Sequence, residues 1–491
     1  MKTTPLFILL LFIANLLFAQ SDQDMVLETV NGNTIKGHIY FLADDLLKGR
    51  ETGTAENKIA ASYLANTFRS YGVQPNPETG NYYQEVYLER SYPAKKITLS
   101  IGGMEIDKIA GLRISNMNYE GDFVYAGYGL EDNYKGLDVK GKVVLVKAGS
   151  AAGSAAQQAF SLIREKRDLA IDKGALAVIE LIQAQDQMWG YVDHQFNSPG
   201  LALAKEKADS NNGFTYMWVQ DADGSMSSKI SSKAIHDGQL RLEVPEKEAL
   251  VSYNIIGMVP GTDPQLKDEF VIYSAHYDHV GVGSPDATGD TIYNGARDNA
   301  VGTTTVLSMA ENLAKYPTKR SALFILFTGE EKGLLGSEFY VDHPVLPLKQ
   351  MVYCFNSDNG GYNDTSLATI VGLSRTTAAP HIKKAASEFG LKAIDDPAPE
   401  QGLFDRSDNV HFARKGIPAP TFSMGFSSFD GEVTKYYHRP GDEADTMDYG
   451  YLEKFFRAYV LSGRLIGNDP QTPVWTSGDK YEKAAKALYN D

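Results

Sequence analysis

The chain has 491 residues, 43% apolar and 22% charged, which is typical of a globular protein and too long for one ordinary core. Its formal net charge of -15 at pH 7 argues against binding to nucleic acid or to an anionic membrane surface. The single cysteine, Cys354, lies in the apolar run MVYCF, so no intrachain disulfide can form.

Residues 1–20 have the pattern of a secretory signal peptide. Lys2 supplies the positive charge, an apolar run extends from Pro5 to Phe18, and Ala19 is a small residue at the expected cleavage point. Because the run is shorter than the roughly 20 residues that a membrane-spanning helix needs, we expect the segment to be removed on export. No later stretch is apolar enough to span a membrane, which predicts a secreted or periplasmic protein.

The pattern of the chain changes twice, which predicts one domain inserted into another. Residues 34–73 have helical periodicity, whereas short strand-like runs broken by glycines extend from about Gly121 to Val244. From Tyr253 onward, strands and helices alternate. We therefore expect a discontinuous domain formed by residues 21–120 and 246–491, and an insert formed by residues 121–245.

The alternation after Tyr253 indicates the α/β class. ALFILF and MVYCF are uninterrupted apolar runs, as expected for strands that are buried on both faces of a parallel sheet. The predicted fold is a mixed, mainly parallel sheet with helices on both faces, and the insert is predicted to be β-rich.

Side chains that can bind metal ions stand where predicted elements begin or end. His276 ends the strand FVIYSAH, Glu331 follows ALFILF, and Asp358 follows MVYCF. Asp298 begins a predicted helix, and His438 lies on a later loop. Sites form beyond the carboxyl ends of strands in open parallel sheets, so we expect these side chains to converge. Each has an ordinary structural role if taken alone, but together they are the ligands that two zinc ions use.

Two residues beside these candidate ligands have predicted roles in the chemistry. Glu330 directly precedes Glu331 and has no evident structural duty, so it is the candidate general base of a metal-assisted hydrolase. Asp278 lies two residues after His276, on the same side of an extended segment, and is expected to accept a hydrogen bond from that imidazole. The other histidines, including His279, are interpreted as surface or packing residues.

Five motifs taken together resemble the di-zinc exopeptidase family of aminopeptidase Y and glutamate carboxypeptidase II. They are AHYDHVG, NGARDNAVGT, LFTGEEKGLLGS, FNSD and YYHRPGDEADT. The amino-terminal segment KGRETGTAENKIAASYLANTFRSYGVQP is similar to that of the family, and YAGYG, KGLDVKGKVVLVKAG and DKGALAVIEL resemble the protease-associated (PA) domain that many members carry. The resemblance covers most of the chain and implies a zinc exopeptidase-like fold, peptide substrates and two zinc ions per chain.

The resemblance also implies a metal role for each of the five candidate ligands. Asp298 would bridge the two zinc ions. His276 and Asp358 would complete the coordination of one ion, and Glu331 and His438 that of the other. The sequence departs from the family where SDN (residues 407–409) replaces SDH, a change outside the ligand set.

Further expectations follow from the same motifs. Glu330 would act as the general base, and the peptide bond after Asp298 would be cis. Tyr437 matches a tyrosine that hydrogen-bonds the tetrahedral intermediate in some members of the family.

The predicted function is a secreted zinc-dependent aminopeptidase, because an acidic site suits a cationic amino terminus. Three alternatives stay open at the level of sequence. A carboxypeptidase of the same fold would use an arginine in the pocket, for which Arg297, Arg406 and Arg439 are candidates. A glutaminyl cyclase-like enzyme would need a single zinc ion. A non-catalytic receptor-like binding protein would be expected to have lost part of the ligand set.

Overall fold

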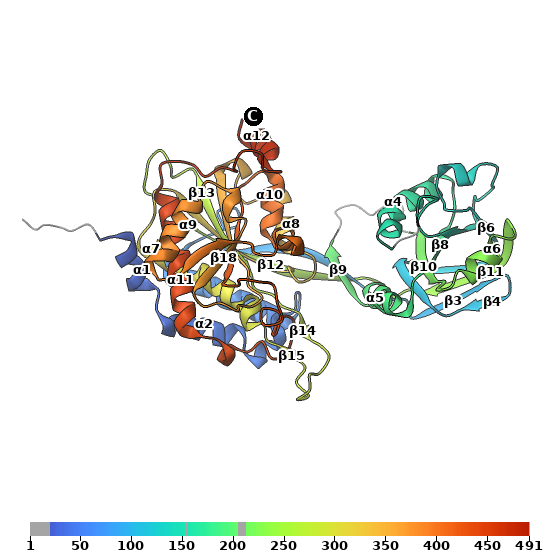
Figure 1. Cartoon of the computed structure of the whole chain (residues 1–491), viewed down its shortest axis with the longest axis horizontal. Coiled ribbons are helices and arrows are strands. Elements are labelled where there is room, and N and C mark those ends of the chain that lie inside the picture. Colours follow the sequence, from blue (N-terminus) through green and yellow to red (C-terminus); the bar gives the residue numbers. More distant parts are fainter. Residues whose placement is uncertain (1–19, 154–155, 205–212, 491) are drawn as a thin grey trace, which may run out of the picture. The chain divides into compact units, whose positions relative to one another are not determined.

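The computed structural model describes residues 20–153, 156–204 and 213–490. The predicted signal peptide, residues 1–20, lies outside the described residues except for Gln20. The chain divides into two compact units, Met1–Glu85 with Ser252–Asp491 and Val86–Val251 (Figure 1). No helix in the described part of the chain is long and apolar enough to cross a membrane.

The first unit is built on a sheet whose main strands are β12 (Glu248–Val259), β13 (Phe270–His276), β16 (Ser321–Phe327), β17 (Met351–Ser357), β18 (Leu367–Val371), β19 (Lys392–Asp395) and β20 (Thr421–Met424). Their order is β19-β18-β20-β17-β13-β16-β12. β13 runs parallel to both β16 and β17, and β17 runs parallel to β20. β12 is antiparallel to β16, and β18 is antiparallel to β20, so the sheet is mixed but parallel at its centre.

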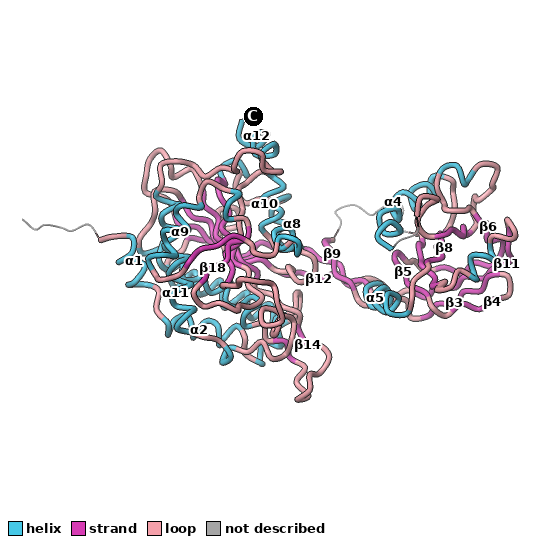
Figure 2. The backbone as a smooth tube through the Cα atoms, viewed as in Figure 1, coloured by secondary structure: helices cyan, strands magenta, loops and turns pink. Residues whose placement is uncertain are grey.

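Helices cover both faces of this sheet (Figure 2). Every residue of β13, β16 and β17 is buried, and successive side chains enter different cores. Ile272 packs in the same core cluster as Phe412, whereas the next residue, Tyr273, packs with Tyr459 in another. The predicted fold class is therefore confirmed. The helices of this unit are α1 (Asp22–Thr29), α2 (Gly32–Leu42), α3 (Ala55–Tyr71), α7 (Gly302–Lys315), α8 (Leu335–Asp342), α9 (Ala379–Glu388), α10 (Asn409–Lys415), α11 (Tyr449–Asn468) and α12 (Glu482–Asn490).

Short elements connect these helices and strands. Two of the helical turns contain residues of the site described below: η1 (Asp45–Arg50) and η3 (Ala296–Val301). The others are η4 (Leu348–Gln350), η5 (Leu373–Arg375), η6 (Pro399–Gln401), η7 (Leu403–Arg406) and η8 (Ala444–Thr446), and the short strands are β1 (Gln74–Pro75), β14 (Gly281–Val282) and β15 (Ile292–Tyr293).

The second unit contains an eight-stranded sheet with the order β4-β3-β11-β6-β7-β8-β10-β5. Its strands are β3 (Lys96–Ile101), β4 (Met104–Ile106), β5 (Ile109–Arg113), β6 (Met117–Tyr125), β7 (Val143–Lys147), β8 (Ala177–Ile182), β10 (Thr215–Gln220) and β11 (Ile235–Glu243). The chain passes to this unit through β2 (Tyr83–Ser91), whose end pairs with β9 (Gly200–Leu203). The remaining elements are α4 (Ala156–Asp172), α5 (Asp186–Phe196), α6 (Ser225–Ile230) and the turn η2 (Glu131–Tyr134).

The insert begins earlier than the sequence pattern predicts. The predicted range was 121–245, but the compact unit extends from Val86 to Val251. The physical reason is strand pairing, because β3 is antiparallel to β11 and β5 is antiparallel to β10. The partners of β3 and β5 lie far along the chain, so no local signal marked these strands as part of the insert.

Candidate metal centre

The candidate ligands lie where strands of the first unit end. His276 is the last residue of β13, and Asp358 directly follows β17. Glu331 follows β16 after a short turn, and His438 lies on the loop between β20 and α11. Asp298 does not begin a helix as predicted, because its φ of -111° and ψ of 90° are non-helical and α7 starts only at Gly302.

All five predicted metal ligands converge, and Asp298 lies between two groups of them. On one side, His276 Nε2 lies 3.4 Å from Asp298 Oδ1 and 3.3 Å from Asp358 Oδ1. On the other side, His438 Nε2 lies 3.3 Å from Asp298 Oδ2 and 3.0 Å from Glu331 Oε2. Each Asp298 oxygen therefore faces a different group. The Asp298–Asn299 peptide bond is cis, which confirms that expectation.

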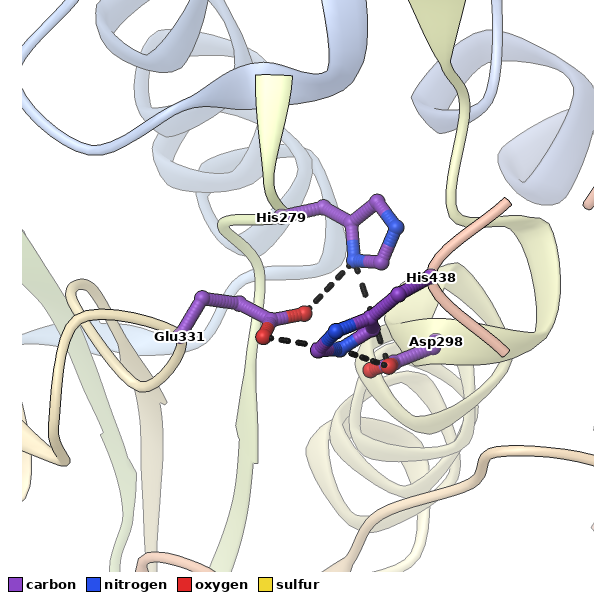
Figure 3. A group of neighbouring side chains, drawn as sticks. All are labelled: His279, Asp298, Glu331 and His438. Carbon is purple, nitrogen blue, oxygen red and sulfur yellow. Dashed lines mark hydrogen bonds and ion pairs between the residues drawn. The ribbon is translucent and has the colours of Figure 1, made fainter. Parts of the chain in front are cut away.

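His279 belongs to the second group, although the sequence interpretation placed it among surface or packing residues. Its Nδ1 lies 2.7 Å from Glu331 Oε1 and 4.0 Å from Asp298 Oδ2, and the side chain is fully buried (Figure 3). In a continued strand His279 would point away from His276. The strand ends at His276, however, and the chain then turns so that both imidazoles face the site. The paired histidines of AHYDH were the available signal.

Asp278 contacts different groups from those predicted. His276 Nδ1 lies 3.2 Å from the backbone carbonyl oxygen of Asp278, whereas the Asp278 carboxylate is 3.8 Å away. A proton on Nδ1 is therefore donated to this carbonyl, which leaves Nε2 free to face the acidic residues. The Asp278 carboxylate instead accepts hydrogen bonds from Thr52 Oγ1 (2.8 Å) and from the backbone N–H of Glu330 (3.2 Å).

Glu330 and Tyr437 line the same pocket as Asp298 and Asp358. Glu330 Oε2 lies 4.0 Å from His276 Nε2, beside the first group of ligands. The ring of Tyr437 stacks on His438, with 3.9 Å between the ring centroids and 19° between the planes. Glu330 and Tyr437, two of the three side chains predicted to act in catalysis, are therefore positioned beside the candidate ligands.

The site concentrates negative charge in a buried place. Burial raises the pKa of Glu330 well above its usual range, and the carboxylates of Asp358 and Glu331 add to this effect although His276 opposes it. Burial also acts to raise the pKa of Asp298, but the imidazoles of His276 and His438 outweigh it and lower that pKa. Without a metal, protonated imidazoles must balance these carboxylates.

The donor set fits two metal ions. Burial acts to lower the pKa of His438, but Asp298 and Glu331 raise it to about 10. Without a metal the ring is therefore protonated, and a metal ion could replace that proton between the imidazole and the two carboxylates. His438 Nε2 is buried and makes no well-oriented hydrogen bond, although carboxylate oxygens lie 3.0 and 3.3 Å away. Imidazole nitrogen and carboxylate oxygen are the ligands that zinc prefers besides thiolate.

An α/β sheet with this donor set at its strand ends is the architecture of a metal-dependent hydrolase. Residues 254–461 match the model of peptidase family M28. The segment includes all five predicted ligands and the candidate general base. The predicted enzyme class, a metallo-exopeptidase, is thereby confirmed.

Several of the similar proteins are aminopeptidases. Aminopeptidase YwaD of Bacillus subtilis is 26% identical over 413 residues, which cover 82% of this chain and 78% of that protein. A probable leucine aminopeptidase 2 of Aspergillus oryzae is 24% identical over 434 residues, which cover 82% of this chain and 80% of that protein. The solved structure of an aminopeptidase from Aneurinibacillus sp. strain AM-1 has the same fold, with a TM-score of 0.60 and 20% identity over 94% of this chain and 99% of that one.

Proposed function

We propose that the protein is a secreted aminopeptidase that removes amino-terminal residues from peptides with the help of two zinc ions. The observation that carries this proposal is the position of Asp298, whose two oxygens face two separate groups of ligands. His276 and Asp358 would hold one ion with Asp298, and Glu331 and His438 would hold the other. Bound there, zinc supplies positive charge that acidifies a bound water and stabilises negative charge on a carbonyl oxygen.

The protein's own residues then move the proton and orient the substrate. Glu330 takes the proton of the attacking water and delivers it to the leaving amine, a role that its buried position beside the ligands supports. Asp278 keeps the Glu330 segment in place through the hydrogen bond from the Glu330 backbone N–H. The Tyr437 hydroxyl donates a hydrogen bond to the oxygen that becomes negative in the transition state.

The pocket is lined by Asp298, Glu330 and Asp358 and by Arg406, and this excess of carboxylates favours an amino terminus over a carboxyl terminus as the recognised end. Arg297, one of the arginines considered for a carboxypeptidase, is buried and paired with Asp442 at 3.0 Å. It also donates to Thr446, so it is not free to bind a substrate carboxylate. Apolar side chains make up part of the pocket wall, which favours an apolar first residue in the substrate; they are Val371, Leu403, Phe426, Phe429 and Val433.

Two parts of the proposal depend on the sequence. The segment 1–20 is proposed to direct export, and the unit Val86–Val251 is proposed to be a PA domain. Mass determination of the mature protein from the exported fraction tests the first, since cleavage near residue 20 is expected.

The enzymatic proposal is tested by metal analysis combined with a panel of aminoacyl p-nitroanilides. We expect close to two zinc ions per chain, cleavage of free aminoacyl anilides, loss of activity with a chelator and recovery with zinc. Amino-terminally acetylated anilides serve as the matched control and should not be cleaved. Cleavage of the acetylated anilides as fast as the free ones would contradict the proposal, and so would a preparation with a single bound zinc ion that is fully active.

A further inference from the structure

The segment Arg50–Thr52 lies against the candidate metal centre and has no part in the proposed chemical steps. We infer that Arg50 is a positioning residue of the metal centre and that Thr52 completes the same contact. Together they hold the two ligand-bearing loops, 276–279 and 294–298, at the spacing that zinc binding requires. This inference rests on the proposed function, because it concerns the proposed zinc ligands.

The guanidinium of Arg50 joins three separate parts of the chain. Its Nε donates to the carbonyl oxygen of Tyr277 at 2.8 Å, between His276 and His279. Its terminal nitrogens donate to the carbonyl oxygens of Asn294 at 2.6 Å and Gly295 at 3.1 Å, just before Asp298. A further hydrogen bond reaches the carbonyl oxygen of Leu42 at the end of α2. One rigid, planar group therefore sets the distance between the two ligand loops.

The environment of Arg50 is unusual for a buried cation. Only 1% of the residue is exposed, and within the described parts of the chain it forms no ion pair with a carboxylate. Burial lowers its pKa to about 10, and the carboxylates of Asp278 and Asp298 oppose that shift, so the group remains charged at neutral pH. Four carbonyl acceptors in fixed directions match the donor fork of arginine, which the single ammonium of lysine does not reproduce.

The backbone of the same segment contacts the second ligand group. The carbonyl oxygen of Arg50 accepts from the backbone N–H of His279 at 3.4 Å and from Asn57 Nδ2 at 3.1 Å. Glu51 forms an isolated β-bridge with His279. Arg50 itself has a φ of 50°, in the left-handed region, so the chain turns sharply to present both its backbone and its side chain to the site.

Thr52 extends this contact to the candidate general base. Its hydroxyl donates to Asp278 Oδ2 at 2.8 Å, and Asp278 Oδ1 accepts from the backbone N–H of Glu330 at 3.2 Å. Loss of the Thr52 hydroxyl would leave one Asp278 oxygen without its donor. The Asp278 backbone and the Glu330 turn would then be held less firmly, and with them His276 and Glu331.

A purely structural role would lower stability without changing metal affinity, and this difference provides the test. The variants are Arg50→Lys and, as a matched control, Arg320→Lys. Arg320 is also buried to 1% exposure, donates to the carbonyl oxygens of Ile466 and Asp469, and pairs with Glu269, but it precedes β16 at the opposite end of the strand from Glu331. Zinc affinity is measured by titration of metal-free protein against a competing chelator, and thermal unfolding of the metal-free protein is followed in parallel.

We expect both lysine variants to unfold at a lower temperature and only Arg50→Lys to lose zinc affinity, by about tenfold or more, as for other residues that orient metal ligands. Zinc affinity of Arg50→Lys within about threefold of wild type, or an equal loss in Arg320→Lys, would overturn the inference. If Arg50→Lys does not fold, the Thr52→Val variant provides the test. A several-fold loss of zinc affinity is expected for Thr52→Val, and an unchanged zinc affinity would refute the proposal. Failure of the wild type to bind zinc would instead reject the proposed function.

Discussion

In the candidate metal centre, single carboxylates lie between two neighbouring imidazoles. Asp298 faces both ligand groups, and Glu331 lies between His279 and His438. Glu330 is different, because its side chain pairs with no described cation closer than His276 at 4.0 Å. A largely buried carboxylate with a raised pKa and an open pocket beside it is suited to proton transfer.

At this scale we predict the effect of Glu330→Gln. The change removes the proton acceptor and keeps the shape of the side chain, so kcat is expected to fall by about 100-fold to 10,000-fold while bound zinc stays at the wild-type level. Steady-state kinetics and metal analysis of the same preparation measure both quantities. Glu338→Gln, on the exposed side of α8, is the matched control and should retain wild-type rates. A Glu330→Gln protein with more than about one tenth of the wild-type kcat would assign the general base elsewhere.

Close packing of helix α7 against strand β17 brings the two ligand groups together. Gly302 begins α7, and a Cβ at this position would collide with the carbonyl oxygen of Ser357 and with the side chain of Asn299. Asn299 follows Asp298, and Ser357 precedes Asp358. The absence of a side chain at Gly302 therefore lets the Asp298 turn approach the end of β17.

At the element scale we predict that Gly302→Ala destabilises the protein by about 1–3 kcal/mol, as overpacking of a tight contact does. The same change should weaken zinc binding, because it separates Asp298 from Asp358. Gly37→Ala is the control: Gly37 is exposed in α2, nothing lies within 4 Å of a Cβ built there, and the gain in helix propensity should stabilise by about 0.5–1 kcal/mol. Chemical denaturation and zinc titration of both variants check this, and equal zinc affinity in the two would contradict it.

The residues of the proposed chemistry and the insert belong to different compact units of the chain. Every candidate ligand lies in the unit Met1–Glu85 with Ser252–Asp491, and none lies in Val86–Val251. A ligand that binds only the folded form stabilises the part of the chain that must fold to form the site. Zinc should therefore protect the two units unequally.

At this scale we predict the outcome of metal removal. With free zinc at about 100 times its dissociation constant, each site adds about 2.7 kcal/mol to the stability of the first unit. A chelator should therefore increase hydrogen exchange in β13, β16 and β17 and leave exchange in β7 and β8 of the second unit unchanged. Mass spectrometry of peptides from both units gives this comparison, and an equal response of β7 and β8 would show that the units do not unfold separately.

Much of the first unit could be predicted from sequence because its signals are local. The apolar runs that form β13, β16 and β17 identify buried strands, and polar residues directly after such runs identify a shared edge of the sheet. The extent of the insert could not be predicted in this way. β3 and β5 resemble strands of either unit, and only their distant partners β11 and β10 assign them.

The sequence by itself determined which side chains are candidates for binding metal, because their identities and their places after strands can be read without knowing any distance. Only the tertiary structure decided which groups support them. The contact of His279 with Glu331, the use of the Asp278 backbone by His276, and the contacts of Arg50 with both ligand loops all join residues whose approach depends on how the chain turns after each strand. Strand periodicity ends where those turns begin, so packing between distant segments sets the geometry there.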